Sequence, residues 1–270
     1  MKHFCRDNDP RVIELRRRLD KFYATTKTYT AFLEPSSQPD FWGLIRREID
    51  DRLAANRSCR ILEFGAGRTG FRAFLGETSV PVEFHVQDVT PQNQSYLETQ
   101  AQQVFICDVR QITGHYDVIF STFVWEHVTN PRELLDHLLG LLNPGGVMAI
   151  ASPRYDFPGY ICPSARHYPL LKQLCLAAWL VSRRLRVVLG GSSDFLIHLD
   201  PAVFHGPWYR DADAIHWVSL ADLRRYIGRR YELTSLRLPV SKAGSLRDRL
   251  VRWLWARRLV LFVRIRARGG

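Results

Sequence analysis

The chain has 270 residues, of which 46% are apolar, and this supports one large folded domain or a core with a small accessory piece. Its formal net charge of +11 predicts an anionic partner such as a lipid surface, a nucleic acid or an acidic substrate, or else an arginine-rich surface that serves no ligand. The five cysteines have no Cys-x-x-Cys spacing, which predicts a reducing compartment and neither a disulfide framework nor a metal site. No apolar run approaches the ~20 residues of a membrane-spanning helix, and the first residues are polar, so no signal peptide is expected. Together these features predict a cytoplasmic protein.

Two amphipathic helices are predicted ahead of the first strand. The first starts after Asp9-Pro10, an N-cap residue followed by proline, and the second starts near Asp40. Their apolar residues recur at helical spacing: Val12, Leu15, Leu19 and Phe22 in the first helix, and Ile45, Ile49 and Leu53 in the second.

The stretch 60–71 predicts a buried strand followed by a glycine-rich turn. The apolar strand ends at Glu63, and Gly65, Gly67 and Gly70 follow as G-x-G-x-x-G. Glycine allows a tight turn and a close approach of the backbone to a ligand. The carboxylate of Glu63 faces that ligand, where it would repel a pyrophosphate and attract a cationic group. A tight turn without a ligand is the alternative interpretation.

Two further predicted strands also end in acids. The strand 80–86 stops at Asp88, and the spacing from Gly67 places this carboxylate where it can accept both ribose hydroxyls of a nucleoside. The strand 104–107 ends at Asp108. NAD enzymes also carry an acid at the first of these positions, so Asp88 predicts a ribose without identifying the cofactor. Three strand-end acids favour a cofactor that has no phosphate.

The segment 116–153 predicts two more strands around a leucine-rich helix. The fourth strand, 117–121, leads into Glu126-His127-Val128. Asn130-Pro131 and Glu133 predict a capping box for the helix, the sequence 143–146 ends it, and 147–151 forms the fifth strand.

The acid and glycine motif, together with 116–153, resembles class I S-adenosylmethionine-dependent methyltransferases of the small-molecule, ubiquinone-biosynthesis type. The resemblance covers 58–153 well. It implies an α/β fold: a Rossmann-like, seven-stranded, mostly parallel sheet with helices on both faces and a lid inserted after strand five. It also implies S-adenosyl-L-methionine as the cofactor, with Asp108 accepting from the adenine amino group. The implied cofactor-binding residues are Glu63, Phe64, Gly65, Ala66, Gly67, Gly70, Asp88, Val89, Asp108, Val109 and Ser121.

The same resemblance divides the chain into four parts. Residues 1–57 are helices that cover the cofactor, 58–153 the cofactor-binding core, 154–212 the inserted lid, and 213–270 the returning core. In that last part a capping box at Ser219 and Asp222 predicts a helix. Strand six at 231–238 and a last strand at 259–263 follow, the last one antiparallel beside the fifth.

The function that this implies is methyl transfer to a small-molecule or carrier-linked acceptor. A hydroxyl of the sugar, polyketide or phenol type is favoured, while nitrogen and carbon acceptors stay open. A hydroxyl must lose its proton as the methyl arrives, and histidine suits that role at neutral pH. The candidates are His216, which follows Asp211 and Asp213, and His127, which lies just past the fourth strand.

Two other classes of function stay open: an NAD-dependent Rossmann oxidoreductase, and a non-catalytic membrane or RNA adaptor on a methyltransferase fold. Nucleic acid is disfavoured as a substrate, because 121–124 reads Ser-Thr-Phe-Val instead of Asn-Pro-Pro-Tyr and no added RNA-binding module is evident. Peripheral contact with an anionic membrane is predicted from Arg183, Arg184 and Arg186 after an apolar helix, and from Trp253 and Trp255 among arginines. The alternative is two helices that pack on the core with solvated arginines.

Overall fold

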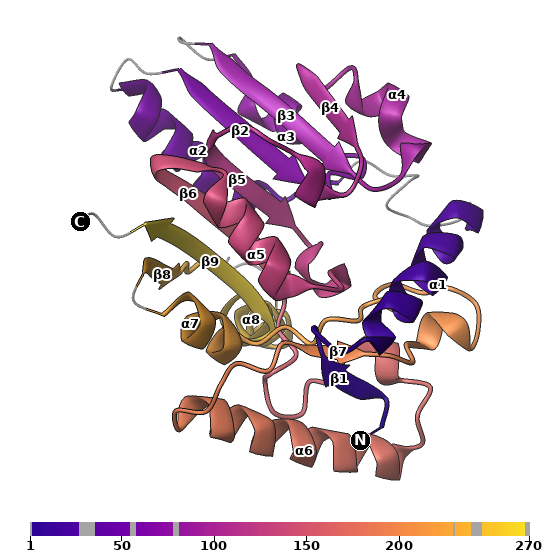
Figure 1. Cartoon of the computed structure of the whole chain (residues 1–270). Coiled ribbons are helices and arrows are strands. Elements are labelled where there is room, and N and C mark those ends of the chain that lie inside the picture. The colour runs from indigo at the N-terminus through magenta and orange to yellow at the C-terminus, as the bar shows by residue number, and fades with distance from the viewer. Residues whose placement is uncertain are drawn as a thin grey trace.

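The computed structural model describes residues 2–26, 36–54, 58–77, 81–228, 230–238 and 245–267. A seven-stranded sheet in the order β4-β3-β2-β5-β6-β9-β8 runs through the molecule (Figure 1). Its strands are β2 (Cys59–Phe64), β3 (Val82–Asp88), β4 (Gln103–Ile106), β5 (Tyr116–Thr122), β6 (Leu142–Pro153), β8 (Tyr231–Ser235) and β9 (Val260–Ala267). The first five strands in this order, β4, β3, β2, β5 and β6, pair in parallel, and β9 is antiparallel to both β6 and β8. This confirms the predicted Rossmann-like α/β fold and the antiparallel last strand beside the fifth.

Helices cover both faces of the sheet because successive strand residues point to opposite faces. In β2, Ile61 packs with α2 (Pro39–Ala54) and α3 (Phe71–Leu75), whereas Leu62 packs with α5 (Pro131–Gly140) and α7 (Leu220–Ile227). A short helix, α4 (Gln94–Leu97), leads into β4. Helices α1 (Arg11–Thr25) and α2 begin close to the two predicted starts. The N-cap residue of α1 is Pro10 and not Asp9 as predicted, although the Asp9 carboxylate accepts from the Arg11 backbone N–H at 3.0 Å. Val80, the predicted start of the second strand, lies outside the described residues.

The helix caps differ in part from the prediction. No side-chain cap forms at Asn130, and its amide nitrogen instead donates to the Asp7 carbonyl at 3.1 Å, because the N-terminal segment runs past the start of α5. The Ser219 hydroxyl does cap α7, accepting from the Asp222 backbone N–H at 3.3 Å. The Asp222 carboxylate does not close the box, since it accepts from the Asp194 backbone N–H at 2.6 Å.

The N-terminal part of the chain packs partly on the segment inserted after β6 and partly on the main sheet. Strand β1 (Phe4–Arg6) pairs antiparallel with β7 (Leu196–His198) of the segment inserted after β6. Apolar residues of α1 share a core with residues from that inserted segment, while α2 packs on the main sheet. The inserted segment also contains α6 (Leu170–Val188), which lies along the edge of the molecule near the N-terminus (Figure 1).

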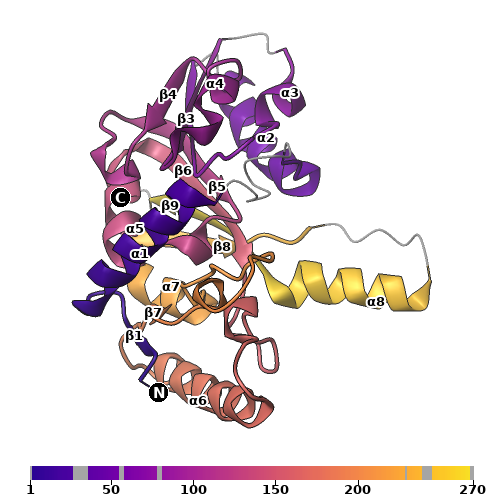
Figure 2. The ribbon, with the colours of Figure 1, turned by 90° about the vertical axis from the view of Figure 1, so that its right-hand side faces the viewer.

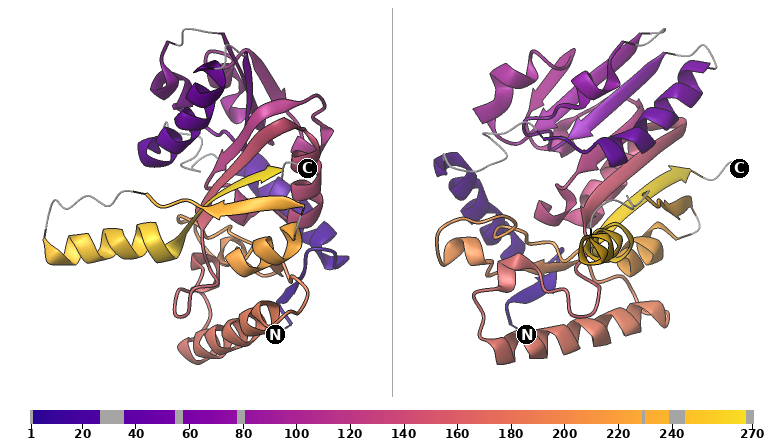
Figure 3. Two further views of the ribbon diagram at one scale, coloured as in Figure 1. Left: turned by 90° about the vertical axis from the view of Figure 1, so that its left-hand side faces the viewer. Right: turned by 180° about the vertical axis from the view of Figure 1, so that it is seen from behind.

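One helix, α8 (Leu246–Leu254), stands away from the body of the protein (Figures 2 and 3). Ser245 caps it in a complete capping box with Asp248, and none of the helix residues is buried. Within the described part of the chain, no helix combines the length and apolar character that crossing a membrane requires.

Candidate active site

The turn after β2 has the backbone conformation that its glycines predicted. Gly65 and Gly67 lie at φ +66° and +55°, in the left-handed region that favours glycine. A Cβ on Gly65 would come within 2.4 Å of Val124 Cγ1, so no larger residue fits without a shift. Gln87 anchors the turn, because its side-chain and main-chain carbonyls accept from the N–H groups of Gly65 and Ala66 at 3.1 and 2.9 Å.

Asp88 lies at the end of β3, beside this turn, as predicted. The residue is 6% exposed, and its two carboxylate oxygens accept from the Gly67 N–H at 2.8 Å and the Thr90 N–H at 3.0 Å. Burial raises the pKa of the Asp88 carboxyl, against the effect of these hydrogen bonds. The Thr90 hydroxyl also donates to Oδ1, at 3.4 Å, whereas Oδ2 accepts from the Gly67 N–H and offers a further lone pair. Asp88 can therefore hold the glycine turn and accept from a ligand at Oδ2.

Glu63 is buried at the end of β2, and its environment suits a donor or cation from a ligand. Burial raises the pKa of its carboxyl to about 8, although a hydrogen bond with Thr69 acts in the opposite direction. Among the described residues its Oε2 atom has no hydrogen-bond partner, and the same holds for the buried hydroxyl of Ser121. Buried acceptors of this kind are costly unless something donates to them. The site therefore fits a cofactor that carries an ammonium and a sulfonium.

The carboxylate of Asp108, another predicted cofactor residue, is already bound by arginines. Asp108 follows β4 as expected, but Arg110 binds its carboxylate at 2.6 and 3.0 Å, and Arg16 of α1 pairs with it too. The Arg110 guanidinium, with help from Arg16, holds the pKa of that carboxyl well below its usual range. An adenine amino group would therefore have to compete with two guanidinium groups for the Asp108 carboxylate. Next to these acids, Val89 is 62% exposed and Val109 is buried.

A cluster of acids surrounds His127 just beyond β5. The turn Trp125–His127 places Glu126 beside His127 in the sequence. Glu126 is 0% exposed, and its carboxylate accepts from the Ser152 hydroxyl at 2.8 Å. The Nδ1 atom of His127 lies 3.3 Å from Asp213 Oδ2, and single ligand atoms of Glu126, His127 and Asp211 lie within 4.8 Å of one another. Asp211 has φ +61°, a strained conformation for a residue with a Cβ.

Burial and the neighbouring charges shift the pKa of the members of this cluster. Burial lowers the pKa of His127, but Asp213, Glu126 and Asp211 outweigh burial and raise it to about 10. Burial raises the pKa of the Glu126 carboxyl to about 7 and raises that of Asp211. At neutral pH His127 is therefore an imidazolium that faces carboxylates.

The other catalytic candidate, His216, lies in the apolar core. It is 0% exposed, and its Nδ1 atom donates to the Trp125 carbonyl at 2.9 Å. Burial lowers the pKa of His216 to about 4. Asp213, which the sequence suggested as a partner for His216, is paired with His127 instead. The structure thus places only His127 within the acidic cluster.

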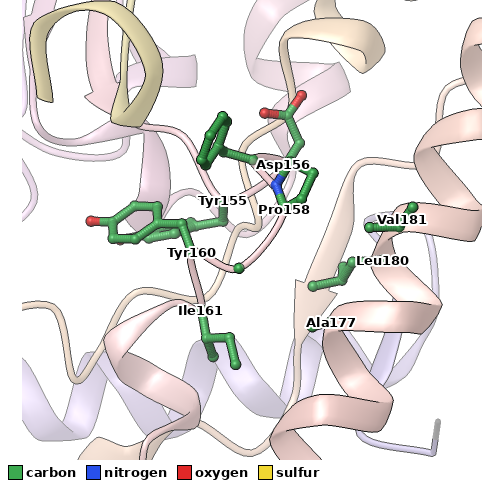
Figure 4. A pocket seen from close by; sticks show the side chains of 10 residues that line it. Tyr155, Asp156, Pro158, Tyr160, Ile161, Ala177, Leu180 and Val181 are labelled. Atoms are coloured by element: carbon green, nitrogen blue, oxygen red, sulfur yellow. The ribbon is translucent and has the colours of Figure 1, made fainter. Parts of the chain in front are cut away.

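A separate small pocket lies in the inserted segment, between the loop 155–161 and α6 (Figure 4). Tyr155, Pro158 and Tyr160 line it from the loop, with Leu180 and Val181 facing them from α6. Its lining includes none of the predicted cofactor or catalytic residues.

A family model described as a methyltransferase domain matches residues 37–234. The chain belongs to this family. The membership confirms the resemblance to methyltransferases, and with it the expectation of a methyltransferase enzyme. No curated protein sequence matches this methyltransferase.

Several solved structures are similar to this methyltransferase. The plantazolicin methyltransferase BpumL in complex with SAH is 11% identical with a TM-score of 0.47, over 97% of this chain and 92% of that one. The N-methyltransferase NodS from Bradyrhizobium japonicum WM9 is 14% identical with a TM-score of 0.44, over 97% and 100%. The CurJ carbon methyltransferase is 13% identical with a TM-score of 0.48, over 84% and 54%. These similarities do not indicate an acceptor.

Proposed function

We propose that this methyltransferase transfers a methyl group from S-adenosylmethionine to a hydroxyl of a small-molecule or carrier-linked acceptor of the sugar, polyketide or phenol type. The observation that carries the proposal is the position of His127. It follows β5 at the edge of the sheet where the glycine turn lies, and Val124, three residues before it, contacts Gly65. An acceptor against His127 therefore lies next to a cofactor held by that turn.

The cofactor is held, in this proposal, by the turn 65–70, Glu63, Asp88 and Ser121. When bound, it supplies a methyl group that is activated by a sulfonium. Asp88 accepts one ribose hydroxyl at Oδ2, beside the Gly67 N–H, and the other at Oδ1, where it displaces the long bond from the Thr90 hydroxyl. Glu63 accepts from the cationic end. Binding of NAD at the same turn is disfavoured, because the buried carboxyl group of Glu63 would face its pyrophosphate.

His127 and its carboxylates provide, in this proposal, the chemistry at the acceptor. The imidazolium stabilises the negative charge that develops on the acceptor oxygen. The proton passes to a carboxylate of the cluster, and Glu126, with a pKa of about 7, is suited to accept it near neutral pH. We assign His216 a positioning role, because its hydrogen bond to the Trp125 carbonyl supports the turn that carries His127.

Calorimetry with the demethylated cofactor, followed by transfer assays with labelled S-adenosylmethionine and hydroxyl acceptors, tests the proposal. We expect binding of that product, no binding of NAD, and label in an alkali-stable ether. The Asp88→Ala variant loses two charge-assisted bonds, so its affinity should fall by about a hundredfold. Tight NAD binding, or unchanged affinity in Asp88→Ala, contradicts the cofactor assignment. Label found only on nitrogen or carbon contradicts the acceptor assignment.

We also propose that α8 brings the enzyme to an anionic membrane, where a lipid-linked acceptor is within reach. Five apolar residues at α8 and just after it are exposed by 38% to 81%: Leu246, Leu250, Val251, Trp253 and Trp255. Arginines alternate with them in the sequence, as in helices that lie at a charged bilayer surface. The Trp255 ring stacks on Phe123 with centroids 6.3 Å apart, and Phe123 directly follows β5. The C-terminal end of the helix therefore lies at the same edge of the sheet as the acceptor cluster.

The three arginines of α6 that were also predicted to contact a membrane have a different role in the structure. Arg183 and Arg186 of α6 pair with Asp194, and Arg184 donates to the Asp156 carbonyl. These arginines hold the inserted segment together, so the membrane proposal rests on α8 alone.

A further inference from the structure

Three histidines from separate parts of the chain surround one carboxylate in the inserted segment. His3 precedes β1, His167 follows the turn Pro163–Ala165, and Asp200 and His205 flank the turn Ala202–Phe204. The pairing of β1 with β7 brings His3 to this place, and the Leu199 N–H donates to the His3 carbonyl at 2.8 Å. Backbone contacts thus hold the ends of the cluster together.

The ring nitrogens of all three histidines face Asp200. His205 Nε2 lies 2.7 Å from Asp200 Oδ1, while His3 Nδ1 and His167 Nε2 lie 3.4 and 3.9 Å from Oδ2. Ligand atoms of His167, Asp200 and His205 lie within 4.8 Å of one another. Tetrahedral zinc, with bonds of roughly 2.0–2.2 Å to nitrogen and oxygen, spaces its ligands by roughly 3.3–3.5 Å. The 2.7 Å contact between His205 and Asp200 must therefore open to admit the ion, and the 3.9 Å contact between His167 and Asp200 must shorten.

The tautomer of His167 gives an independent reason to place a cation here. Its Nδ1 atom lies 3.1 Å from the Ser164 carbonyl, which only accepts, so Nδ1 carries a proton. In the neutral ring the lone pair on Nε2 then faces the Asp200 carboxylate. Within the described residues, that buried Nε2 atom has no hydrogen-bond partner. A cation between the two acceptors removes this conflict, and an Nδ1–H bond to a carbonyl is the outer contact that metal-bound histidines make.

We propose that His3, His167, Asp200 and His205 form a zinc site. His167, Asp200 and His205 supply three ligand atoms that already lie together, whereas His3, with Nδ1 at 3.4 Å from Asp200 Oδ2, lies outside that group and moves in as the fourth ligand. The completed tetrahedral set suits Zn²⁺ and leaves no position for a substrate. The site is therefore structural, and it fastens the N-terminal strand to the inserted segment. It lies apart from the methyl-transfer residues and does not depend on the proposed function.

Two lysines oppose a cation at this site. The charges of Lys172 and Lys2 both act on His3, and the Lys172 ammonium lies 3.3 Å from the centre of the Tyr168 ring. A Lys172→Gln variant should therefore bind zinc severalfold more tightly than the wild type.

The test uses the tag-free full chain, stripped with a chelator and titrated with Zn²⁺ alone. We expect one zinc per chain, a melting temperature that rises by several degrees with zinc, and intense visible absorption when Co²⁺ replaces it. His205→Ala and Asp200→Asn should weaken binding by about a hundredfold. His115→Ala, which removes an exposed histidine elsewhere, should bind like the wild type.

Zinc binding by His205→Ala and Asp200→Asn that equals the wild type overturns the proposal, and so does a loss in His115→Ala of the same size. Stoichiometric zinc without tetrahedral Co²⁺ absorption overturns the assigned ligand set. His205 has 43% of its side chain exposed, so its substitution leaves the folded core intact.

Discussion

At the scale of single residues, Glu63 couples cofactor binding to pH. Its carboxyl is largely protonated at pH 7, because burial raises its pKa to about 8. A bound ammonium or sulfonium favours the carboxylate, so binding releases a proton below pH 8. Affinity for the demethylated cofactor should rise from pH 6 to pH 8, by at most about tenfold per pH unit, and level off above that.

Calorimetry in two buffers of different ionisation enthalpy measures this proton release directly. Glu63→Gln should bind more weakly, with affinity independent of pH. Glu83→Gln, at a side chain that is 44% exposed and pairs with Arg60, is the matched control and should keep the pH dependence. A slope in Glu63→Gln that equals the wild type rules out this role for Glu63.

His127 and His216 should respond differently to the same substitution. His127→Gln removes the cation from the acidic cluster, and we expect turnover to fall by ~10²–10⁴-fold while cofactor affinity is unchanged. His216→Gln changes a fully buried side chain, so its main effect should be a lower melting temperature.

The pH profile of turnover provides a second measurement on these variants. The wild type should gain activity through pH 7 as Glu126 ionises, and lose it near pH 10 as His127 deprotonates, with both limits belonging to the coupled cluster. His127→Gln should lack the alkaline limit. Normal turnover in His127→Gln, together with a large loss in a stably folded His216→Gln, would reverse the two roles.

At the scale of elements, α8 makes a prediction that α6 does not share. Liposomes that contain anionic lipid should carry the wild-type protein upward in a density gradient at low salt, and less so at high salt. Trp253→Ala should reduce flotation, because tryptophan prefers the depth of the headgroups. Leu174→Ser, at a residue of α6 that is 58% exposed, is the control and should float like the wild type. Wild-type protein that stays at the bottom of the gradient at low salt excludes the membrane contact.

The elements of the main sheet could be predicted because their signals are local. An apolar run, an acid and a glycine turn are adjacent in the sequence, so β2, its turn and Asp88 could be placed from periodicity and spacing. The predicted side-chain cap at Asn130 was wrong, because the Asn130 side chain instead donates to the carbonyl of Asp7, which is distant in the sequence. The same limit applies to Asp108, whose carboxylate is bound by Arg16 from a helix that precedes the sheet.

At the scale of the whole molecule, the contacts that were missed join the N-terminal segment to the inserted one. Strand β1 pairs with β7, and Tyr23 of α1 donates to Asp213 at 2.8 Å. No periodicity in a single sequence signals a pairing between segments so far apart. The acidic cluster around His127 and the three-histidine cluster both depend on this packing, and therefore only the structure reveals them.

Asp194 is the clearest test of that packing. Its side chain is 1% exposed and pairs with Arg6 of β1 at 3.2 Å, with Arg183 of α6 at 2.7 Å, and with Arg186. Asp194→Asn leaves three guanidinium groups together without a counter-charge. Removing one partner of a buried ion pair typically costs about 3–5 kcal/mol, and the part-exposed arginines put this case at the lower end.

We therefore expect Asp194→Asn to lower the melting temperature by about 6–12 °C, since 1 kcal/mol corresponds to roughly 2–4 °C in a domain of this size. Asp50→Asn is the matched control, because Asp50 pairs with Arg46 on the surface of α2. Surface pairs of this kind contribute about 0.3–0.5 kcal/mol, so its melting temperature should stay within about 2 °C of the wild type. Equal melting temperatures for the two variants would mean that β1 and α6 are held to the molecule by their apolar contacts and not by Asp194.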